Sequence, residues 1–341
     1  MTKSPKVPTS VDIARAVGMS QATVSRALNG GVVSDETRER ILAISKSLGY
    51  SPNAVARGLV TSRTGLVGVV VSDITNPFYP EFLEEIGRTL AERDQQMLLQ
   101  NAATGDQEGA VELLLQQRVD GIIFMAATAT IGIIRDLVRR RFPIVLANRT
   151  VDLPCDSVQG DNVAGAASIV DHLYGLGHRR FAVLEGTAST STAVQRNQGF
   201  VGRLEEYGLE LRDEFVVPTD FRYEQAFEGT QRLLDRRYPP SAIFCHNDLL
   251  AIAALNAIKD RGLRAPDDIS VVGFDNTLQS RWQSINLTTV NQPLAAMAAR
   301  SVELLGDRLA EPDLPPRHEV FPAELVVRGS TGRRRPRPRR G

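Results

Sequence analysis

Cysteine, histidine and long hydrophobic runs are all scarce in this sequence of 341 residues. The two cysteines, Cys155 and Cys245, form no CxxC pair, and the four histidines lack the spacing of metal ligands. No apolar stretch approaches the roughly 20 residues that span a bilayer, and the opening MTKSPKVPTS lacks the hydrophobic segment of a secretory signal. These absences predict a cytoplasmic protein with reduced thiols, no metal site and no membrane segment.

Common catalytic and nucleotide-binding motifs are also missing. The sequence contains no GxSxG, HExxH or GxxxxGK pattern, and no GxGxxG follows the first predicted strand. We therefore expect neither an enzyme nor a bound cofactor. An enzyme of the doubly wound α/β type with an accessory head stays open as the less favoured alternative.

Acidic and basic residues balance to a net charge of zero, but they are unevenly distributed. Residues 1–64 hold nine basic and four acidic residues, a balance of +5, and residues 333–341 add six arginines and no acid. The stretch between them carries 25 basic and 36 acidic residues, a balance of −11. Only the two ends of the chain therefore favour binding to a polyanion such as DNA.

Residues 9–29, TSVDIARAVGMSQATVSRALN, have the pattern of a helix-turn-helix. Thr9 and Asp12 form a capping-box pattern at the start of a first helix, and Gly18 suits the sharp turn after it. Ser20 is placed to cap a second helix, whose exposed first turn carries short polar side chains. Such side chains are what a recognition helix presents to base edges in the major groove.

The head continues with a third predicted helix and a short hinge. Ser34 is placed to cap the third helix, and residues 49–52 end it. The segment 53–61, NAVARGLVT, has helical spacing at Val55 and Leu59, but nine residues are too few to stay helical alone. We expect this hinge to order only against a partner. The predicted apolar faces of the three helices are Ile13, Ala14 and Val17; Val24, Ala27 and Leu28; and Ile41, Ile44 and Leu48.

From residue 66 the pattern changes to strand-length hydrophobic runs that alternate with amphipathic helices. Runs of Val, Ile and Leu between helices are typical of parallel strands covered on both faces. Two such series predict an α/β fold with two doubly wound parallel-sheet lobes, in which a ligand sits at the carboxyl ends of the strands. The predicted strands are 67–71, 97–100, 121–125, 144–147, 181–184, 216–217, 242–245, 269–274 and 288–290. The predicted helices are 80–93, 106–118, 131–141, 164–175, 193–207, 223–236 and 249–261.

Carboxylates, amides, arginines and aromatic rings gather where these strands end. Such a set suits a small polyhydroxylated ligand, because bidentate groups pair with vicinal hydroxyls and rings stack on sugar faces. The residues alone also allow structural roles: ion pairs for Arg149 and Arg196, core packing for Phe78 and Phe221, and a turn cap for Asp275. The residues concerned are Asp73, Asn76, Phe78, Tyr79, Asn148, Arg149, Asp161, Asn162, Arg196, Phe221, Asn247, Asp248, Asp275 and Gln292.

The head, the hinge and the two-lobed body, in this order, resemble the lac repressor/gal repressor (LacI/GalR) family of bacterial transcription factors over roughly residues 8–330. The resemblance rests on SVDIARAVGMSQATVSRALN, VSDETRERILAISKSLGYSPNAVARGL, NPFY, VDGIIF, NDLLAIAAL, ISVVGFDN and LTTVNQP. The last three segments also resemble periplasmic sugar-binding proteins, which share the body fold but lack a DNA-binding head. The resemblance implies an all-α helix-turn-helix head joined to a periplasmic-binding-protein-like body.

The resemblance also implies roles for individual positions. Gln21, Ala22 and Arg26 match base-reading residues in the major groove, and Leu59 matches the leucine that wedges into the central base step from the minor groove. Gly58 is unusual in the hinge helix, and Ala22 stands where a larger polar residue is often found. The predicted DNA contacts are Gln21, Ala22, Thr23, Ser25, Arg26, Asn29, Arg57 and Leu59. The predicted effector contacts are Asp73, Phe78, Tyr79, Asn148, Arg149, Arg196, Phe221, Asn247, Asp275 and Gln292.

The sequence thus predicts a ligand-responsive transcriptional regulator, favoured as a repressor, that binds a near-palindromic double-stranded DNA operator as a homodimer. A carbohydrate is the favoured effector; a nucleobase, a nucleoside or a protein co-regulator stays open. Inducer and corepressor action are both allowed. The predicted parts are a helix-turn-helix head (1–52), a hinge (53–64), lobe 1 (65–161 and 291–320), lobe 2 (162–290 and 321–331) and a disordered basic tail (332–341).

Overall fold

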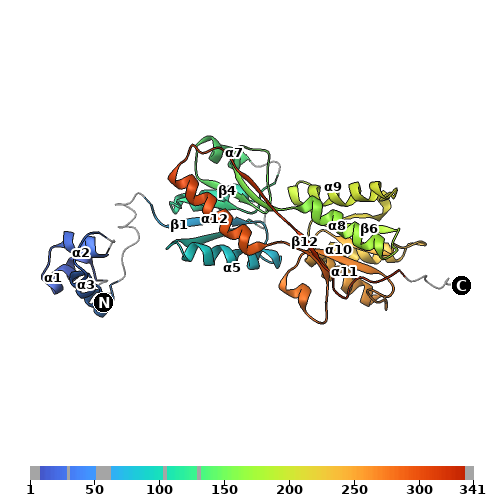
Figure 1. Cartoon of the computed structure of the whole chain (residues 1–341), viewed down its shortest axis with the longest axis horizontal. Coiled ribbons are helices and arrows are strands. Elements are labelled where there is room, and N and C mark those ends of the chain that lie inside the picture. The colour runs from blue at the N-terminus through green and yellow to red at the C-terminus, as the bar shows by residue number, and fades with distance from the viewer. Residues whose placement is uncertain (1–7, 29–30, 51–62, 103–105, 129–131, 335–341) are drawn as a thin grey trace, which may run out of the picture. The chain divides into compact units, whose positions relative to one another are not determined.

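The chain divides into two compact units, a head over Met1–Gly65 and a body over Leu66–Gly341. Figure 1 shows the all-helical head in blue and the body, in which helices surround two sheets, in the remaining colours. This computed structural model describes residues 8–28, 31–50, 63–102, 106–128 and 132–334.

The described residues of the head form three helices, and each begins at a polar cap. They are α1 (Ser10–Val17), α2 (Gln21–Leu28) and α3 (Asp35–Ser47). The predicted capping box is confirmed, because the Thr9 hydroxyl accepts from the Asp12 N–H at 3.4 Å and the Asp12 carboxylate accepts from the Thr9 N–H at 2.9 Å. Ser20 and Ser34 cap the other two helices through their hydroxyls. Gly18 ends α1 with φ 69°, a left-handed conformation that glycine adopts without strain.

The core of the head confirms most of the predicted apolar faces. Leu28 and Ile44 are half-buried and pack against it, but Leu48, predicted to join it, is 40% exposed. Leu48 lies beyond the last helical residue and caps the end of α3. Ser45 is buried instead, and its hydroxyl donates to the Ile41 carbonyl at 2.7 Å. The buried hydrophobic residues of this core are Ile13, Ala14, Val17, Val24, Ala27 and Ile41.

The first lobe of the body is a parallel sheet with helices on both faces. Its strands are β1 (Leu66–Val71), β2 (Gln96–Asn101), β3 (Gly121–Phe124), β4 (Ile144–Ala147), β5 (Asp156–Gly160) and β11 (His318–Phe321), in the order β11-β5-β4-β3-β1-β2. Its helices are α5 (Phe78–Ala91), α6 (Gln107–Gln116), α7 (Gly132–Arg139) and α12 (Leu294–Ala310). Successive residues of β1 alternate between two hydrophobic clusters: Val69 packs with α5 and α12, and Val70 with α6 and α7.

The second lobe repeats this plan with one antiparallel edge strand. Its strands are β6 (Phe181–Glu185), β7 (Val216–Pro218), β8 (Ala242–Cys245), β9 (Ser270–Asp275), β10 (Thr288–Asn291) and β12 (Glu324–Val326), in the order β12-β10-β9-β8-β6-β7. Among its described strands, β12 alone pairs antiparallel. Its helices are α8 (Asn162–Gly175), α9 (Ser191–Glu206), α10 (Tyr223–Leu234) and α11 (Asp248–Asp260). The α8 and α9 helices share one hydrophobic cluster, and α10 and α11 share the other.

Three segments of the chain cross between the lobes. They join β5 to α8, β10 to α12 and β11 to β12, and the last is the red ribbon that runs between the lobes in Figure 1. Because β5 and β10 each leave their sheet for the other lobe, the carboxyl ends of both sheets meet at the boundary between the lobes. This is where open α/β sheets bind ligands.

The predicted strands and helices of the body are confirmed to within a few residues at each end, but six elements were not among them: β5, β11, β12, α12 and two short 3-10 helices, Asp213–Phe215 and Leu278–Arg281. The β5 strand, DSVQG, has no apolar run, and its first residue, Asp156, is buried because Arg308 and Arg317 both pair with it. The β11 and β12 strands are short and half-exposed. The α12 helix begins without a capping side chain, so the usual start signal is absent.

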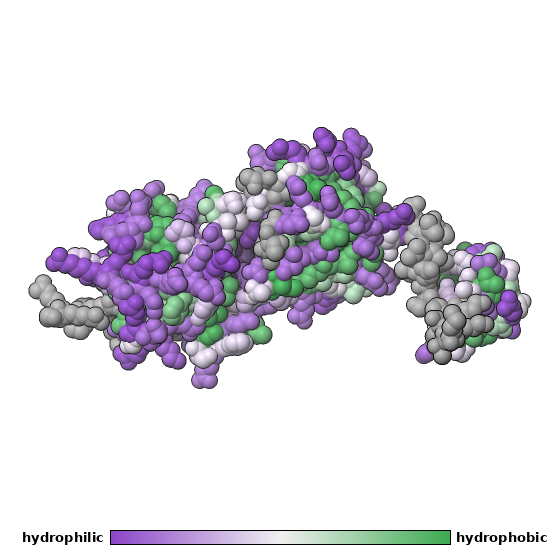
Figure 2. Space-filling view, turned by 180° about the vertical axis from the view of Figure 1, so that it is seen from behind, coloured by the Kyte–Doolittle hydropathy of each residue, from purple (hydrophilic) through white to green (hydrophobic). Residues whose placement is uncertain are grey.

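The part of the chain that the structure describes has no helix that is both long and apolar enough to cross a membrane, and no group of His, Cys, Asp and Glu side chains that could hold a metal ion. Cys155 and Cys245 are both buried and unpaired, in the cores of different lobes. Figure 2 shows a largely hydrophilic surface on the face of the molecule that it presents.

Candidate functional site

One face of α2 carries polar side chains that lie outside the hydrophobic core of the head. Val24 and Ala27 are buried on the opposite face, which fixes the helix against α1 and α3. The exposed residues are Gln21, Ala22, Ser25 and Arg26, and Thr23 is half-buried. Five of the predicted DNA contacts therefore lie on one helix; Asn29, Arg57 and Leu59 lie outside the described residues.

These side chains differ in how firmly the head holds them. Gln21 Nε2 donates to Ser10 Oγ at 3.2 Å, and the Thr23 hydroxyl lies 2.9 Å from that of Ser20. Among the described residues, the Arg26 guanidinium makes one hydrogen bond, 3.4 Å from Nε to the Ala22 carbonyl, and pairs with no carboxylate. Its two terminal nitrogens are therefore available for a bidentate contact.

Arg38 of α3 is a positioning residue that the sequence did not reveal. Its guanidinium donates to the Ala27 carbonyl at 3.0 Å and to the Gly31 carbonyl at 2.8 Å. These bonds satisfy a carbonyl at the end of α2 and tie the following loop to α3. The only sequence signal was an arginine early in a predicted helix, which is usually a solvated residue.

In the body, a small cavity of about 20 Å³ lies between the two lobes. Lobe 1 contributes side chains that follow β1 and β4, and lobe 2 contributes side chains that follow β7, β8 and β9 or open α9. Eight of the ten predicted effector residues line it, together with Asn76 and Thr192. The lining residues are Asn76, Phe78, Tyr79, Asn148, Arg149, Thr192, Arg196, Phe221, Asn247 and Asp275.

Asp73 and Gln292 are brought near the cavity but do not line it. The Asp73 carboxylate accepts from the Thr75 N–H at 2.9 Å and from its hydroxyl at 2.7 Å, so it closes the turn after β1. Gln292 Nε2 donates to Asp275 Oδ1 at 2.8 Å. Gln292 therefore orients a lining carboxylate from behind.

Arg196 of α9 organises the lobe 2 wall. It is 2% exposed, and its Nε donates to Asn162 Oδ1 at 2.9 Å. Its terminal nitrogens donate to the His246 carbonyl and, at 3.2 Å, to Asp275 Oδ1. The guanidinium carbon lies 3.8 Å from the centre of the Phe274 ring, within range of a cation–π interaction. Arg196 thus forms the ion pair that the sequence allowed and also lines the cavity, as predicted.

Burial shapes the ionisation of this wall. Desolvation raises the pKa of Asp275 to about 6, although the Arg196 charge acts in the opposite direction. Desolvation also lowers the pKa of Arg196, and the Asp275 charge offsets part of that effect. Behind the wall, burial and then the Arg196 charge lower the pKa of His246 to about 3. His246 is neutral, accepts from the Gly186 N–H at 3.1 Å, and lies 3.0 Å from Asn197 Oδ1.

Three lining residues have backbone conformations that residues other than glycine rarely adopt. Asn148 has φ 67°, Phe221 has φ 59° and Asp275 has φ 117°. The Phe221 ring lies over Gly186, where a Cβ atom would approach the ring to 2.0 Å. Such strain persists only where the surroundings hold it, and it gathers at ligand sites.

Three lining side chains also keep a buried polar atom without a partner among the described residues. These atoms are Asn148 Oδ1, Arg149 Nε and Asn247 Nδ2. The other end of Asn247 is occupied, because its Oδ1 caps α11 by accepting from the Leu250 N–H at 2.9 Å. Buried polar atoms are usually paired, so a cluster of unpaired ones in a cavity indicates a ligand site.

Sequence reasoning assigned Phe78 to either the cavity or the core, and the structure gives it both. Its ring is 2% exposed and makes edge-to-face contacts with Tyr79 and Phe82, at centroid distances of 5.5 and 5.6 Å. Asn76 lines the cavity too, and its Oδ1 accepts from the Phe78 N–H at 3.2 Å. Thr192 had no signal in the sequence, because it lies in the first turn of α9 and not at the end of a strand.

Two family models match the chain. One, described as bacterial regulatory proteins of the lacI family, matches residues 10–53, and the other, described as a periplasmic binding protein-like domain, matches residues 170–331. Among curated relatives, HTH-type transcriptional regulator DegA of Bacillus subtilis and HTH-type transcriptional repressor CytR of Escherichia coli are 35% and 31% identical to this chain. The alignments cover 94% and 96% of this chain and 97% and 98% of those proteins.

Solved structures agree with these matches. The lac repressor dimer bound to operator and the anti-inducer ONPF is 28% identical, with a TM-score of 0.85 over 96% of this chain and all of that one. The complex of transcriptional regulator CelR with cellobiose is 31% identical, with a TM-score of 0.73 over 95% of this chain and 99% of that one. This chain belongs to the lacI family of bacterial regulatory proteins, and it is a DNA-binding transcriptional regulator rather than an enzyme.

Proposed function

We propose that this protein represses transcription from the cytoplasm by binding an operator as a homodimer, and that a small molecule in the interlobe cavity controls this binding. The observation that carries the proposal is the set of unpaired buried atoms, Asn148 Oδ1, Arg149 Nε and Asn247 Nδ2, around one cavity. An effector with several hydroxyls satisfies all three at once. The family membership supplies the link from that ligand to DNA.

On DNA, α2 enters the major groove with Gln21, Ala22 and Arg26 toward the base edges. Arg26 pairs bidentately with a guanine, which is worth about 1–3 kcal/mol of discrimination. A two-fold dimer places two such helices in successive major grooves of a near-palindromic site. The lac repressor structure, a dimer bound to operator, supports this arrangement. Thr23, Ser25, Asn29 and Arg57 are proposed as supporting contacts.

Leu59 of the hinge supplies the second element of DNA binding in this proposal. Two copies of its side chain unstack one central base step from the minor groove and bend the duplex. Unstacking costs a few kcal/mol, which closer groove contact offsets.

A groove on lobe 2 supports dimerisation of the body. It has a volume of about 720 Å³ and lies between α11 and the segment 282–286. Trp282 lines the groove and is 51% exposed, and Leu278, four positions earlier in the chain, is 55% exposed. Large exposed apolar side chains beside a groove are typical of protein interfaces. We propose that a second copy of this chain covers them.

The cavity suggests how a ligand changes the body. At about 20 Å³ it has room for roughly one water molecule. A sugar-sized effector therefore binds only when the lobes move apart, so its affinity differs between the two arrangements. That difference is what a ligand needs in order to shift a conformational equilibrium.

Two hydrogen bonds across the boundary between the lobes define the arrangement that the ligand disturbs. The Thr150 N–H of lobe 1 donates to Ser191 Oγ of lobe 2 at 2.9 Å. The Leu278 N–H of lobe 2 donates to Glu81 Oε1 of lobe 1 at 2.6 Å. When these bonds break, the lobes reorient, and with them the start of β1, where the hinge from the head joins the body.

The lining favours a carbohydrate as the effector. Asp275 and Asn247 offer hydrogen-bonding groups for vicinal hydroxyls, and the Phe221 ring offers a stacking face. Solved relatives bind cellobiose in one case and ribose in another. Tyr79 also lines the cavity, and Gln292 contributes by orienting Asp275.

A combined binding experiment tests this function. An operator is first selected from genomic fragments with the full chain, and a panel of sugars and nucleosides is then screened by thermal unfolding. We expect a compound that raises the melting temperature also to change operator affinity in a gel shift. The matched variants are Asn247→Ala, which removes a lining amide, and Gln198→Ala, which removes an exposed amide of α9.

The proposal fails if the full chain prefers no genomic fragment at moderate ionic strength. Its second part, control by a small molecule in the cavity, fails if Asn247→Ala and Gln198→Ala respond identically to every compound that alters operator affinity. Retention of a protein from extract by the full chain, with no response to any small molecule, favours the co-regulator alternative.

A further inference from the structure

We propose that the effector carries an anionic group in addition to its hydroxyls, and that Arg149 binds this group. The inference rests on the proposed function and specifies in addition that the ligand is negatively charged. The chemical class is a hydroxyl-rich acid, in which a carboxylate or a phosphate is attached to a sugar or polyol.

Arg149 is buried without a counter-charge. It is 8% exposed, it forms no ion pair with any carboxylate of the described residues, and its Nε lacks an acceptor. Arg196, by contrast, is paired with Asp275 at 3.2 Å. Removing a charge from water is strongly unfavourable unless an opposite charge accompanies it. A ligand that supplies the missing negative charge relieves this penalty.

The Arg149 side chain is held in place for such a contact. It follows Asn148, whose φ of 67° turns the chain into the cavity wall, and its guanidinium carbon lies 5.6 Å from the centre of the Phe221 ring. A cation–π contact at that distance orients the group without neutralising it. The planar guanidinium then presents parallel N–H donors, a geometry that fits carboxylate and phosphate oxygens.

The amino end of α9 adds to the positive potential at the same place. Thr192, in its first turn, lines the cavity beside Arg149 and is 2% exposed. Within the described part of the chain, the backbone N–H groups of Ser191 and Thr192 donate to no acceptor. Free N–H groups and the helix dipole at such an end both favour an anion. The helix is 16 residues long, so the dipole is fully developed.

Among the charged side chains that line the cavity, cations outnumber anions. Two arginines, Arg149 and Arg196, face one carboxylate, Asp275. The two arginines also repel each other, because the Arg149 charge contributes to lowering the pKa of Arg196. A neutral sugar leaves Arg149 without an ion-pair partner among the described residues, whereas an anionic ligand supplies one. The acid group is expected beside Arg149, and the hydroxyls beside Asp275 and Asn247.

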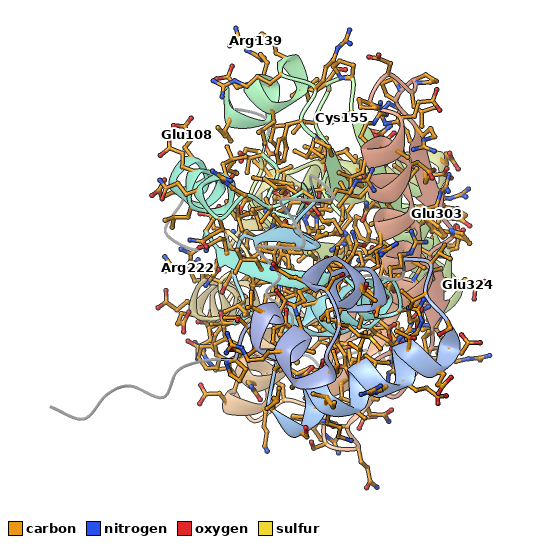
Figure 3. All side chains as sticks on the ribbon, turned by 90° about the vertical axis from the view of Figure 1, so that its left-hand side faces the viewer. Glu108, Arg139, Cys155, Arg222, Glu303 and Glu324 are labelled. Atoms are coloured by element: carbon orange, nitrogen blue, oxygen red, sulfur yellow. The ribbon has the colours of Figure 1, made fainter. Side chains whose placement is uncertain are left out.

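Thermal unfolding of the full chain tests this inference. The probes are sodium phosphate, D-glucuronate, D-glucose 6-phosphate and uncharged D-glucose, all at one ionic strength set with chloride. The proteins are wild type, Arg149→Met and the control Arg139→Met. Arg139 is 73% exposed and projects outward from α7, as Figure 3 shows.

We expect at least one anion to raise the melting temperatures of wild type and of Arg139→Met. Each of these increases should exceed the increase for Arg149→Met by at least about 2 °C. The comparison between variants removes the general stabilisation that phosphate gives to any folded protein. A larger effect of glucuronate identifies a carboxylate ligand, and a larger effect of the two phosphates identifies a phosphate.

Equal shifts of the three proteins with every anion overturn the inference. Failure of this inference is separable from failure of the proposed function. If a neutral sugar alters operator affinity while no anion distinguishes Arg149→Met from wild type, the effector site stands and its anionic character is wrong. If the protein has no operator, the proposed function fails whatever the anions do.

Discussion

The DNA-facing helix of the head and the interlobe cavity of the body hold their polar side chains in opposite ways. On α2, Arg26 is exposed and makes a single hydrogen bond among the described residues, at 3.4 Å. In the cavity, Arg196 is 2% exposed, bonds to three different residues and stacks on Phe274. Arg26 therefore lies on the surface of the head with few contacts to the fold, whereas Arg196 of the body both supports the fold and faces the cavity.

This difference determines whether a substitution can change ligand or DNA binding without changing stability. A change on the exposed face of α2 alters binding alone, because no buried partner is left unsatisfied. A change in the cavity wall alters binding and folding together, because Asn162, the His246 carbonyl and Asp275 all depend on one guanidinium. Variants in either unit can test this contrast between changes that affect binding alone and changes that affect both binding and stability.

The largest effect is expected for Arg196→Ala. Removal of one partner of a buried ion pair leaves the other charge uncompensated, so the body should lose about 3–5 kcal/mol of unfolding free energy. Urea unfolding followed by circular dichroism measures the loss. The control is Arg203→Ala on the same helix, whose side chain is 37% exposed and should change stability by less than about 0.5 kcal/mol. Similar losses for the two variants would mean that the wall does not depend on Arg196.

The next largest effect is expected in the head, where a substitution should change DNA binding and leave the unfolding free energy unchanged. Arg26→Ala should reduce discrimination between the selected operator and scrambled DNA by about 1–3 kcal/mol, because one bidentate base contact disappears. Competition gel shifts measure this ratio, and urea unfolding should superimpose on that of wild type. The control is Arg15→Ala on α1, whose side chain is 78% exposed. A loss of stability in Arg26→Ala would contradict the contrast between the units.

The geometry of parallel sheets explains which cavity residues could be predicted from the sequence. Carboxyl ends of parallel strands meet at one edge, so polar residues after β1, β4, β8 and β9 were predictable neighbours. Asp73 departed from this pattern because a two-residue turn to Thr75 satisfies it locally. Thr192 was missed because helix starts bring residues to the same edge without any strand signal.

Other features depend on contacts between distant parts of the sequence, which no local pattern contains. The β5 strand is polar because Asp156 is neutralised by Arg308 and Arg317, more than 150 positions away. Arg38 orients the end of α2 through two carbonyls in a neighbouring element. The capping box of Thr9 and Asp12, by contrast, spans three residues and was predicted correctly.

A smaller effect is expected from pH and again concerns the body. Burial raises the pKa of Asp248 to about 7, above its ordinary value of 3.8. The folded protein then binds this proton more tightly than the unfolded chain, so its contribution to stability is fully present at low pH and is lost as pH rises through 7. Between pH 6 and 8 the loss amounts to about 1.4 kcal/mol.

Urea unfolding at several pH values tests this dependence. Asp248→Asn should flatten the curve, because the amide keeps an oxygen for the Thr277 N–H but cannot ionise. Asp260→Asn, at the exposed end of the same helix, should retain the dependence of wild type. A curve for Asp248→Asn that falls as steeply as wild type would assign the dependence to another group.

The smallest effect is expected in the head, and it tests whether the two units fold independently. Thr9→Ala removes both hydrogen bonds that the Thr9 hydroxyl makes with Asp12, which should destabilise the head by about 1 kcal/mol. Hydrogen exchange of the α1 amides should accelerate while exchange in β1 stays unchanged. The control is Val11→Ala, since that side chain is 46% exposed and outside the core. Faster exchange in β1 as well would show that the head stabilises the body, and then even a variant on the exposed face of α2 would reach the effector site.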